Sequence, residues 1–179
     1  MERTIKSLLH RIQVARQQMI GEISSLSKEE GALKPALSGW SIQDVIEHLV
    51  LAERAGFDLI YTAAECYREG NPVWTGISEN EGLSIEAIID KTWKPKEKAP
   101  PSATPTGELS LGIWLSHFKS CDDLLLNLKP ILKGLPLEKV INPHFLCGSL
   151  NVIQRLEFIR YHIERHHLQV VHIKKELLF

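Results

Sequence analysis

Apolar residues recur every three or four positions along four long stretches of this chain, which is the spacing that places them on one face of an α-helix. The first stretch runs from about residue 2 to about residue 25. Its apolar face consists of Ile5, Leu8, Ile12, Ala15, Met19, Ile23 and Leu26. No pair of segments shows the alternating pattern of paired strands. The sequence therefore predicts an all-α fold in which four long helices bury their apolar faces against one another, a four-helix bundle.

Two of the predicted helices carry recognisable start signals. Ser41 is followed three residues later by Asp44, an arrangement in which the hydroxyl accepts a backbone N–H that the first helical turn leaves without a partner. The second helix should therefore begin near residue 42. Asn151 and Gln154 stand in the same relation and predict the start of the fourth helix, which continues almost to the end of the chain.

The third predicted helix covers about residues 108–132, with its last turn disturbed at Pro130. A long connection, residues 70–107, precedes it and contains a short helical pattern at 83–93 followed by the Pro-rich piece 94–107. Connections of this length in compact domains are usually functional or disordered. Two roles stay open: a link that runs the length of the bundle between two parallel helices, or a lid over a site.

Composition excludes several classes of partner. The chain has 179 residues, 44% of them hydrophobic, which suits one domain over residues 1–179. Lys and Arg number 21 against 22 for Asp and Glu, so no excess of charge would gather nucleic acid or anionic lipid. The N-terminus lacks the apolar segment of a signal peptide, and no apolar run approaches membrane-spanning length. We therefore expect a cytoplasmic protein that binds neither nucleic acid nor membrane.

The three cysteines, Cys66, Cys121 and Cys147, are widely spaced and form no CxxC pair. An odd number in this arrangement argues against a disulfide framework or a cysteine-based zinc site. We expect them to be small residues of the core.

Histidines are concentrated near the C-terminus, where residues 160–172 hold four of the eight. His162, His166 and Gln169 lie at spacings of four and three, so they share a helix face, and that face also carries the apolar residues. His167 and His172 fall on other sides of the helix and are expected to be solvated. Two imidazoles should therefore point into the bundle.

A third histidine, His48, is expected to point inward from the second helix. Its neighbours on the same face are small or apolar: Val45, Ala52, Ala55 and Leu59. Burying an imidazole without a partner costs about 1–3 kcal/mol. A divalent transition metal, with zinc and nickel the first choices, would supply that partner and keep positions open for water or substrate. Core histidines bonded to Gln, Ser or backbone groups are the alternative.

Three segments carry a family resemblance. "GWSIQDVIEHL", residues 39–49, resembles the W-S-x6-H-L signature of the DinB-like (YfiT-like) superfamily. "PHFLCGSLNVIQRLEFIRYHIERHHLQVV", residues 143–171, is similar to its His-x3-Gly-x-Leu and His-x3-His-x2-Gln pattern, and the Pro-Thr-Gly of "KAPPSATPTGELSLGIWLSHF", residues 98–118, is similar to its third-helix entry. The resemblance implies the same four-helix fold and a metal triad of His48, His162 and His166.

The resemblance also implies a function. Relatives of this kind use a three-His metal to activate a low-molecular-weight thiol, and others are described as hydrolases. We expect a metal-dependent enzyme that acts on a small substrate by thiol transfer or hydrolysis; the alternative is a non-catalytic metal-binding or stress-response module.

Some relatives have an Arg-rich third helix, whereas here Lys119 is the cation of "SHFKSCDDLLLNL". A homodimer is the expected assembly, because bundles with an exposed apolar flank often dimerise.

Three further residues are candidates for the pocket or for contacts with the ligands. Trp40 either lines the pocket or packs as a hydrophobic staple at the helix start. His144 either approaches the open side of the site or packs in its loop. Gln169 is expected to bond a ligand histidine or a metal-bound water. Glu47 is a neighbour of His48 in sequence but points about a hundred degrees away around the helix, so no catalytic residue is assigned.

Overall fold

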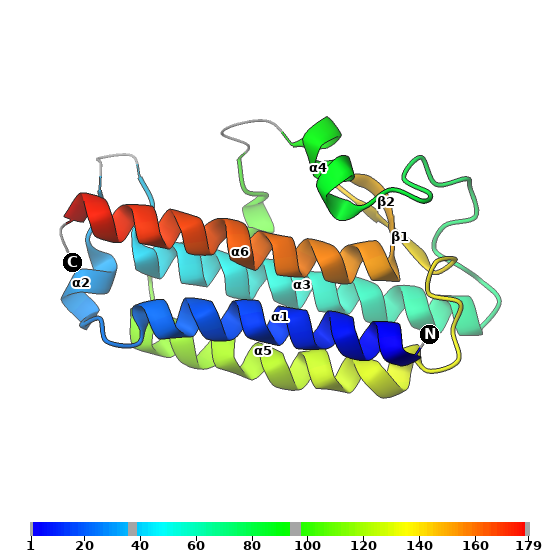
Figure 1. The fold of residues 1–179 in the computed structure, drawn as a ribbon, viewed down its shortest axis with the longest axis horizontal. Helices are drawn as coiled ribbons and strands as arrows, with labels where there is room; N and C mark the ends of the chain where they lie inside the picture. Colours follow the sequence, from blue (N-terminus) through cyan, green and yellow to red (C-terminus); the bar gives the residue numbers. More distant parts are fainter. Residues whose placement is uncertain (1, 36–38, 94–97, 178–179) are drawn as a thin grey trace.

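The computed structural model describes residues 2–35, 39–93 and 98–177. Its four long helices lie side by side as a bundle (Figure 1): α1 (Glu2–Ile23), α3 (Ile42–Arg68), α5 (Leu111–Leu132) and α6 (Val152–Leu177). The shorter elements are α2 (Lys28–Ala32), α4 (Ile85–Thr92), the 3-10 turn η1 (Pro101–Ala103), β1 (Ile141–His144) and β2 (Gly148–Asn151). The predicted four-helix bundle is confirmed. Among the described residues, no helix combines the length and apolar character that crossing a membrane requires.

The directions of the helices explain the long connection before α5. α1 and α6 run one way along the bundle, and α3 and α5 run the other way (Figure 1). Because α3 and α5 are parallel, the chain has to return along the bundle between them. The predicted short helix in this crossover is α4. Residues 94–97 of the Pro-rich piece lie outside the described residues.

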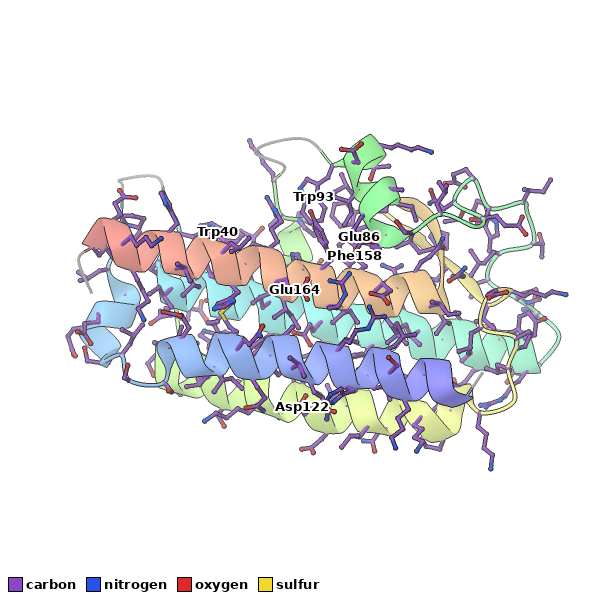
Figure 2. All side chains as sticks on the ribbon, in the orientation of Figure 1. Trp40, Glu86, Trp93, Asp122, Phe158 and Glu164 are labelled. Atoms are coloured by element: carbon purple, nitrogen blue, oxygen red, sulfur yellow. The ribbon has the colours of Figure 1, made fainter. Side chains whose placement is uncertain are left out.

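The predicted apolar faces are buried. α3 packs against both α5 and α6, while α1 packs against α6 and α5. A buried ion-pair cluster lies within this apolar core: the Arg16 guanidinium of α1 binds Glu53 of α3 and Asp122 of α5. Figure 2 labels Asp122 beside α1 and α5. Because both carboxylates contact one fully buried guanidinium, this cluster fixes the relative positions of three helices.

Both predicted helix starts are confirmed. The Ser41 hydroxyl accepts from the Asp44 N–H, and the Asp44 carboxylate accepts from the Ser41 N–H. Asn151 and Gln154 make the same reciprocal pair of bonds at the start of α6. These caps fix the residue at which each helix begins, and with it the rotation of each helix face.

The end of the crossover is attached to α3 by one carboxylate. Glu47 is buried and accepts hydrogen bonds from the Thr106 N–H, the Thr106 hydroxyl and the Gly107 N–H, at 2.8, 2.9 and 3.0 Å. Gly107 has φ +73°, a conformation that glycine adopts without strain. The Pro-Thr-Gly segment is therefore a docking turn, and Glu47 faces it instead of the histidines, as its predicted direction implies.

The strand pair and helix α2 were not predicted. Strands β1 and β2 form an antiparallel hairpin, in which Ile141 pairs with Asn151 and His144 with Gly148. Each strand has four residues, too few for an alternating pattern to be visible. Helix α2 is similarly short and is capped by Ser27. The hairpin and α4 share a second apolar cluster beside the bundle: Ile85, Ile88, Ile89, Cys147 and Leu150.

Cys121 and Cys147 are buried as predicted, whereas Cys66 is only half-buried. Cys66 lies in the last turn of α3, two residues before the helix ends at Arg68. Pro130 lies inside α5, which ends two residues later at Leu132.

The docking turn gives the first prediction. Glu47→Ala removes the charged acceptor of three hydrogen bonds that attach this turn to α3, so the free energy of unfolding should fall by about 2 kcal/mol. Urea unfolding followed by circular dichroism measures the change. Glu65→Ala, at an exposed position of the same helix, is the control and should change stability by less than about 0.5 kcal/mol. Equal losses in the two variants would contradict the role of the docking turn.

Candidate metal centre

Three imidazoles from two helices converge inside the bundle. The His162 Nε2 atom lies 3.1 Å from the Nε2 of His48 and 3.1 Å from the Nε2 of His166. One ring nitrogen from each residue lies within 4.8 Å of the other two. His48 comes from α3, and the other two lie one turn apart on α6, which packs against α3. None of the three residues is more than 6% exposed.

The outer nitrogens of two rings are held by oxygen atoms that can only accept. His48 Nδ1 lies 2.7 Å from the carbonyl oxygen of Ala103, and His166 Nδ1 lies 2.7 Å from Oε1 of Gln169. Each Nδ1 must therefore carry the proton, so each neutral ring directs an Nε2 lone pair toward His162. The His162 Nε2 can donate one proton at most. At least one lone pair consequently has no proton to accept, and a cation would satisfy it.

Burial keeps these rings neutral. It lowers the pKa of His48, lowers that of His166 to about 3 with help from His48, and lowers that of His162 well below its usual value. The neutral imidazole is the form that binds metals. At neutral pH the cluster therefore presents three uncharged rings and no proton to displace.

The spacing of the nitrogens fits a metal ion. Zinc–nitrogen bonds of about 2.0–2.1 Å separate neighbouring ligand atoms by roughly 3.0 Å in octahedral and 3.4 Å in tetrahedral coordination. Two of the three separations here are 3.1 Å. The cluster could hold a divalent metal ion. Hydrogen bonds to Gln and backbone groups, the alternative role for buried histidines, satisfy the outer nitrogens of His48 and His166 but leave at least one inner lone pair without a donor.

The cluster lies in the wall of a cavity of about 530 Å³. Trp93 and Phe158 stack with ring centroids 5.8 Å apart, and Phe158 stacks on His162 at 5.6 Å. Both aromatic residues lie on the side of α6 nearest α4 (Figure 2). Residues of α3, α6, the crossover and the hairpin turn complete the lining. The histidines therefore face a largely apolar space that is big enough for a small molecule.

The prediction that the His48 face of α3 points into the core is wrong for the residues that follow His48. Ala52, Ala55 and Leu59 line the cavity instead of the core, and Leu59 is 39% exposed. Helical spacing places these residues on the His48 face, but it does not show whether a neighbouring helix covers them or a cavity lies beside them. The small side chains of Ala52 and Ala55 leave space that the cavity occupies.

Trp40 lies at the site. Its ring centroid is 4.9 Å from that of His48, and it stacks on His166 at 6.2 Å. It lines the cavity and also packs against the main core beside the Ser41 cap. Trp40 therefore lies in the wall of the cavity, which is one of its two predicted roles.

Gln169 and His144 orient neighbouring groups. Gln169 bonds His166, as one of its two predicted roles requires. His144 Nδ1 accepts from the N–H groups of Leu146 and Cys147, so the ring caps the hairpin turn, and it also lines the cavity. His144 does not join the three converging nitrogens.

The two remaining histidines of α6 differ from each other. The His172 side chain is 78% exposed, as expected of a solvated residue. The His167 side chain is only 25% exposed, and its Nε2 lies 3.8 Å from a carboxylate oxygen of Glu22. The prediction of a solvated His167 was wrong, because α1 packs against that side of α6.

Sequence reasoning also missed the cations and the aromatic wall of the cavity. Arg155, Phe158 and Arg165 line it from α6, and Trp93 lines it from the end of α4. Arg155 lies seven residues before His162, which places both on one face of a helix. The seven-residue spacing therefore indicates, from the sequence alone, that Arg155 lies on the same helix face as His162.

Comparisons with known proteins agree with the fold. No protein-family model matches the chain. The chain is 28% identical over 164 residues to the uncharacterized protein YuaE of Bacillus subtilis (strain 168), covering 91% of this chain and 94% of that protein. The structure is similar to that of TT2238, described as a four-helix bundle protein, with a TM-score of 0.60, 17% identity and coverage of 94% and 98% of the two chains. What this chain shares with TT2238 is the four-helix bundle architecture.

The converging nitrogens predict which histidine matters for metal binding. His166→Ala removes one of three ligands, so the zinc bound per chain after dialysis should fall by about tenfold or more. His167→Ala, one residue along on the side facing α1, should retain wild-type metal content. Inductively coupled plasma mass spectrometry on protein without a His tag measures the zinc content of both variants. A comparable loss in the two variants would contradict the assigned face of α6.

The lowered histidine pKa values predict how metal-free stability depends on pH. His48, His144, His162 and His166 all have a lower pKa in the folded chain than the value of about 6.5 expected when unfolded. Below about pH 6.5 the unfolded chain takes up protons that the folded chain does not, so stability present above that pH is lost as the pH falls.

The thermal midpoint of chelator-treated protein should therefore drop between about pH 7.5 and pH 5, where most carboxylates stay ionised. His144→Gln removes one of these titrating groups, and its midpoint should depend less on pH. A midpoint that stays constant over this range in the wild type would show that the rings are not buried in neutral form.

Proposed function

We propose that this chain is a metal-dependent enzyme of the DinB-like superfamily that acts on a small substrate by thiol transfer or hydrolysis. His48, His162 and His166 would hold a divalent transition metal, zinc or nickel. One observation carries the proposal. The rings of His48 and His166 are each held by a hydrogen bond at Nδ1, and their Nε2 lone pairs point toward His162 beside a cavity. A site with a solely structural role needs no such space next to it.

The protein's own groups orient the proposed ligands. The Ala103 carbonyl holds His48 and the Gln169 amide holds His166, and such outer partners fix both the tautomer and the direction of a ligating ring. Three protein ligands leave coordination positions for a substrate. A divalent metal bound there would lower the pKa of a thiol or water and polarise a carbonyl group.

The cavity residues support a small, partly apolar substrate. Trp40, Trp93 and Phe158 pack around the imidazoles and give this part of the cavity an apolar wall. A low-dielectric wall of this kind strengthens electrostatic interactions with a bound molecule. The volume of about 530 Å³ lies within the usual range for sites that bind small molecules.

The cysteines support a nucleophile supplied by a bound molecule. None of Cys66, Cys121 and Cys147 lines the cavity. Burial raises the pKa of Cys121 to about 12, and burial likewise raises that of Cys147. A thiol that keeps its proton at neutral pH is a poor nucleophile. A low-molecular-weight thiol or a water molecule therefore suits the site better than a covalent intermediate on cysteine.

The proposal predicts an activity that depends on the cluster. Protein without a His tag should retain about one zinc or nickel per chain and should consume a small thiol in the presence of an electrophilic arene, or hydrolyse an activated ester. Chelation should abolish the reaction and added metal should restore it.

His167→Ala is the matched control and should retain the activity that His166→Ala loses. Metal bound at one equivalent with no turnover of any thiol or ester tested would favour the non-catalytic metal-binding module. Equal activity in the two variants would place the reaction outside the cluster.

A further inference from the structure

Arg155 is a buried cation that lines the cavity. It lies on α6, is only 4% exposed, and its Nη2 donates to Oδ1 of Asn142 at 3.1 Å and to the carbonyl oxygen of Pro143 at 2.9 Å. Its Nε is enclosed and has no hydrogen-bond partner in the described part of the chain. Both acceptors are neutral, so they orient the guanidinium without balancing its charge.

The contrast with Arg16 shows why this is unusual. Both arginines are almost completely buried, but Arg16 contacts the carboxylates of Glu53 and Asp122. No described carboxylate makes an ion pair with Arg155. Burial lowers the pKa of Arg155 to about 10, so the group is still protonated at neutral pH. A buried charge is normally paired, because leaving it unpaired is costly.

The cavity that Arg155 lines carries two further cations. Arg165 and Lys98 line the same cavity, and the Arg165 guanidinium lies 4.5 Å from the centre of the Trp93 ring. Glu53 is the single acidic side chain among the described lining residues, and its carboxylate is already paired with Arg16. The cavity therefore has an excess of positive charge before any metal is added.

We propose that the substrate is a small carboxylate with an apolar body, and that Arg155 binds its carboxylate. This inference rests on the proposed function, because it assigns the cavity to the substrate of that reaction. Arg155 and His162 are seven residues apart, which is about 10 Å along a helix. The apolar body lies between them against Phe158 and Ile159, and its reacting end lies at the three histidines.

The charge of the group favours a carboxylate over a phosphate. A single buried guanidinium, with one nitrogen already committed to Asn142 and Pro143, balances one negative charge. A phosphate monoester carries nearly two charges and three acceptor oxygens, which require more donors than this end of the cavity provides.

Binding to the metal-free protein tests the inference. The probes are 4-phenylbutyrate, which spans about the required length, its neutral amide 4-phenylbutanamide, and 4-phenylbutyl phosphate. Tryptophan fluorescence and the nitrogen–proton NMR signal of Arg155 Nε report binding. We expect the carboxylate to bind about tenfold or more tightly than the amide and to shift the Arg155 signal. Equal affinities would overturn the inference, and tighter binding of the phosphate would overturn the assigned class.

Variants assign the effect to Arg155. Arg155→Met should weaken 4-phenylbutyrate by about tenfold or more while leaving 4-phenylbutanamide within about twofold. Arg54→Met, at an exposed position of α3, is the control and should change neither affinity. Undiminished carboxylate binding in Arg155→Met would overturn the inference. If that variant does not fold, the carboxylate and amide affinities of the wild type, with the Arg155 signal, decide the matter.

The design separates this inference from the proposed function. A chelated protein has no metal that could hold the carboxylate, so binding measured there depends on the side chains alone. Failure of metal binding or catalysis would leave the result of the probe comparison intact. Conversely, loss of the charge preference would leave the three-His centre in place.

Discussion

The site depends on one packing contact, the seam in which α3 meets α6. This seam places His48 opposite His162 and His166, so their separations are set by the helices and not by mobile loops. The buried cluster of Arg16 with Glu53 and Asp122 holds α1, α3 and α5 together and thereby limits sliding of α3. Where the residues on α3 become small, the seam opens into the cavity. The rigid bundle therefore supplies both the converging rings and the space beside them.

The crossover is part of the site as well as a link between parallel helices. Glu47, the residue just before His48, attaches the last residues of the crossover to α3, and the same segment brings the Ala103 carbonyl to the outer nitrogen of that histidine. In the middle part of the crossover, Trp93 stacks over Phe158. The connection thus fixes the tautomer of one proposed ligand and provides one wall of the cavity. A long loop of this kind is retained at little cost in stability, because loop-closure entropy grows slowly with length.

Sequence reasoning reached the four helices and the convergence of His48, His162 and His166, because helix caps and apolar spacing determine which way each side chain points. It could not reach groups whose role depends on distant partners. The Ala103 carbonyl has no side-chain signature, and the β1–β2 hairpin depends on pairing across a turn instead of on a pattern within either strand. Leu59 was placed inside because spacing alone does not reveal that a cavity lies beside this face of α3. The missing counter-charge of Arg155 is visible only once every neighbour has a position.

The central claim is that one ion contacts three imidazole nitrogens from two helices. X-ray absorption spectroscopy of the zinc-loaded protein, compared with His48→Ala, tests it most directly because it counts the ligands and measures their distances. We predict three imidazole nitrogens at about 2.0–2.1 Å in the wild type and two in the variant, which loses the ligand from α3. An unchanged number of imidazoles in His48→Ala, or a wild-type zinc environment without three nitrogen ligands, would contradict the account.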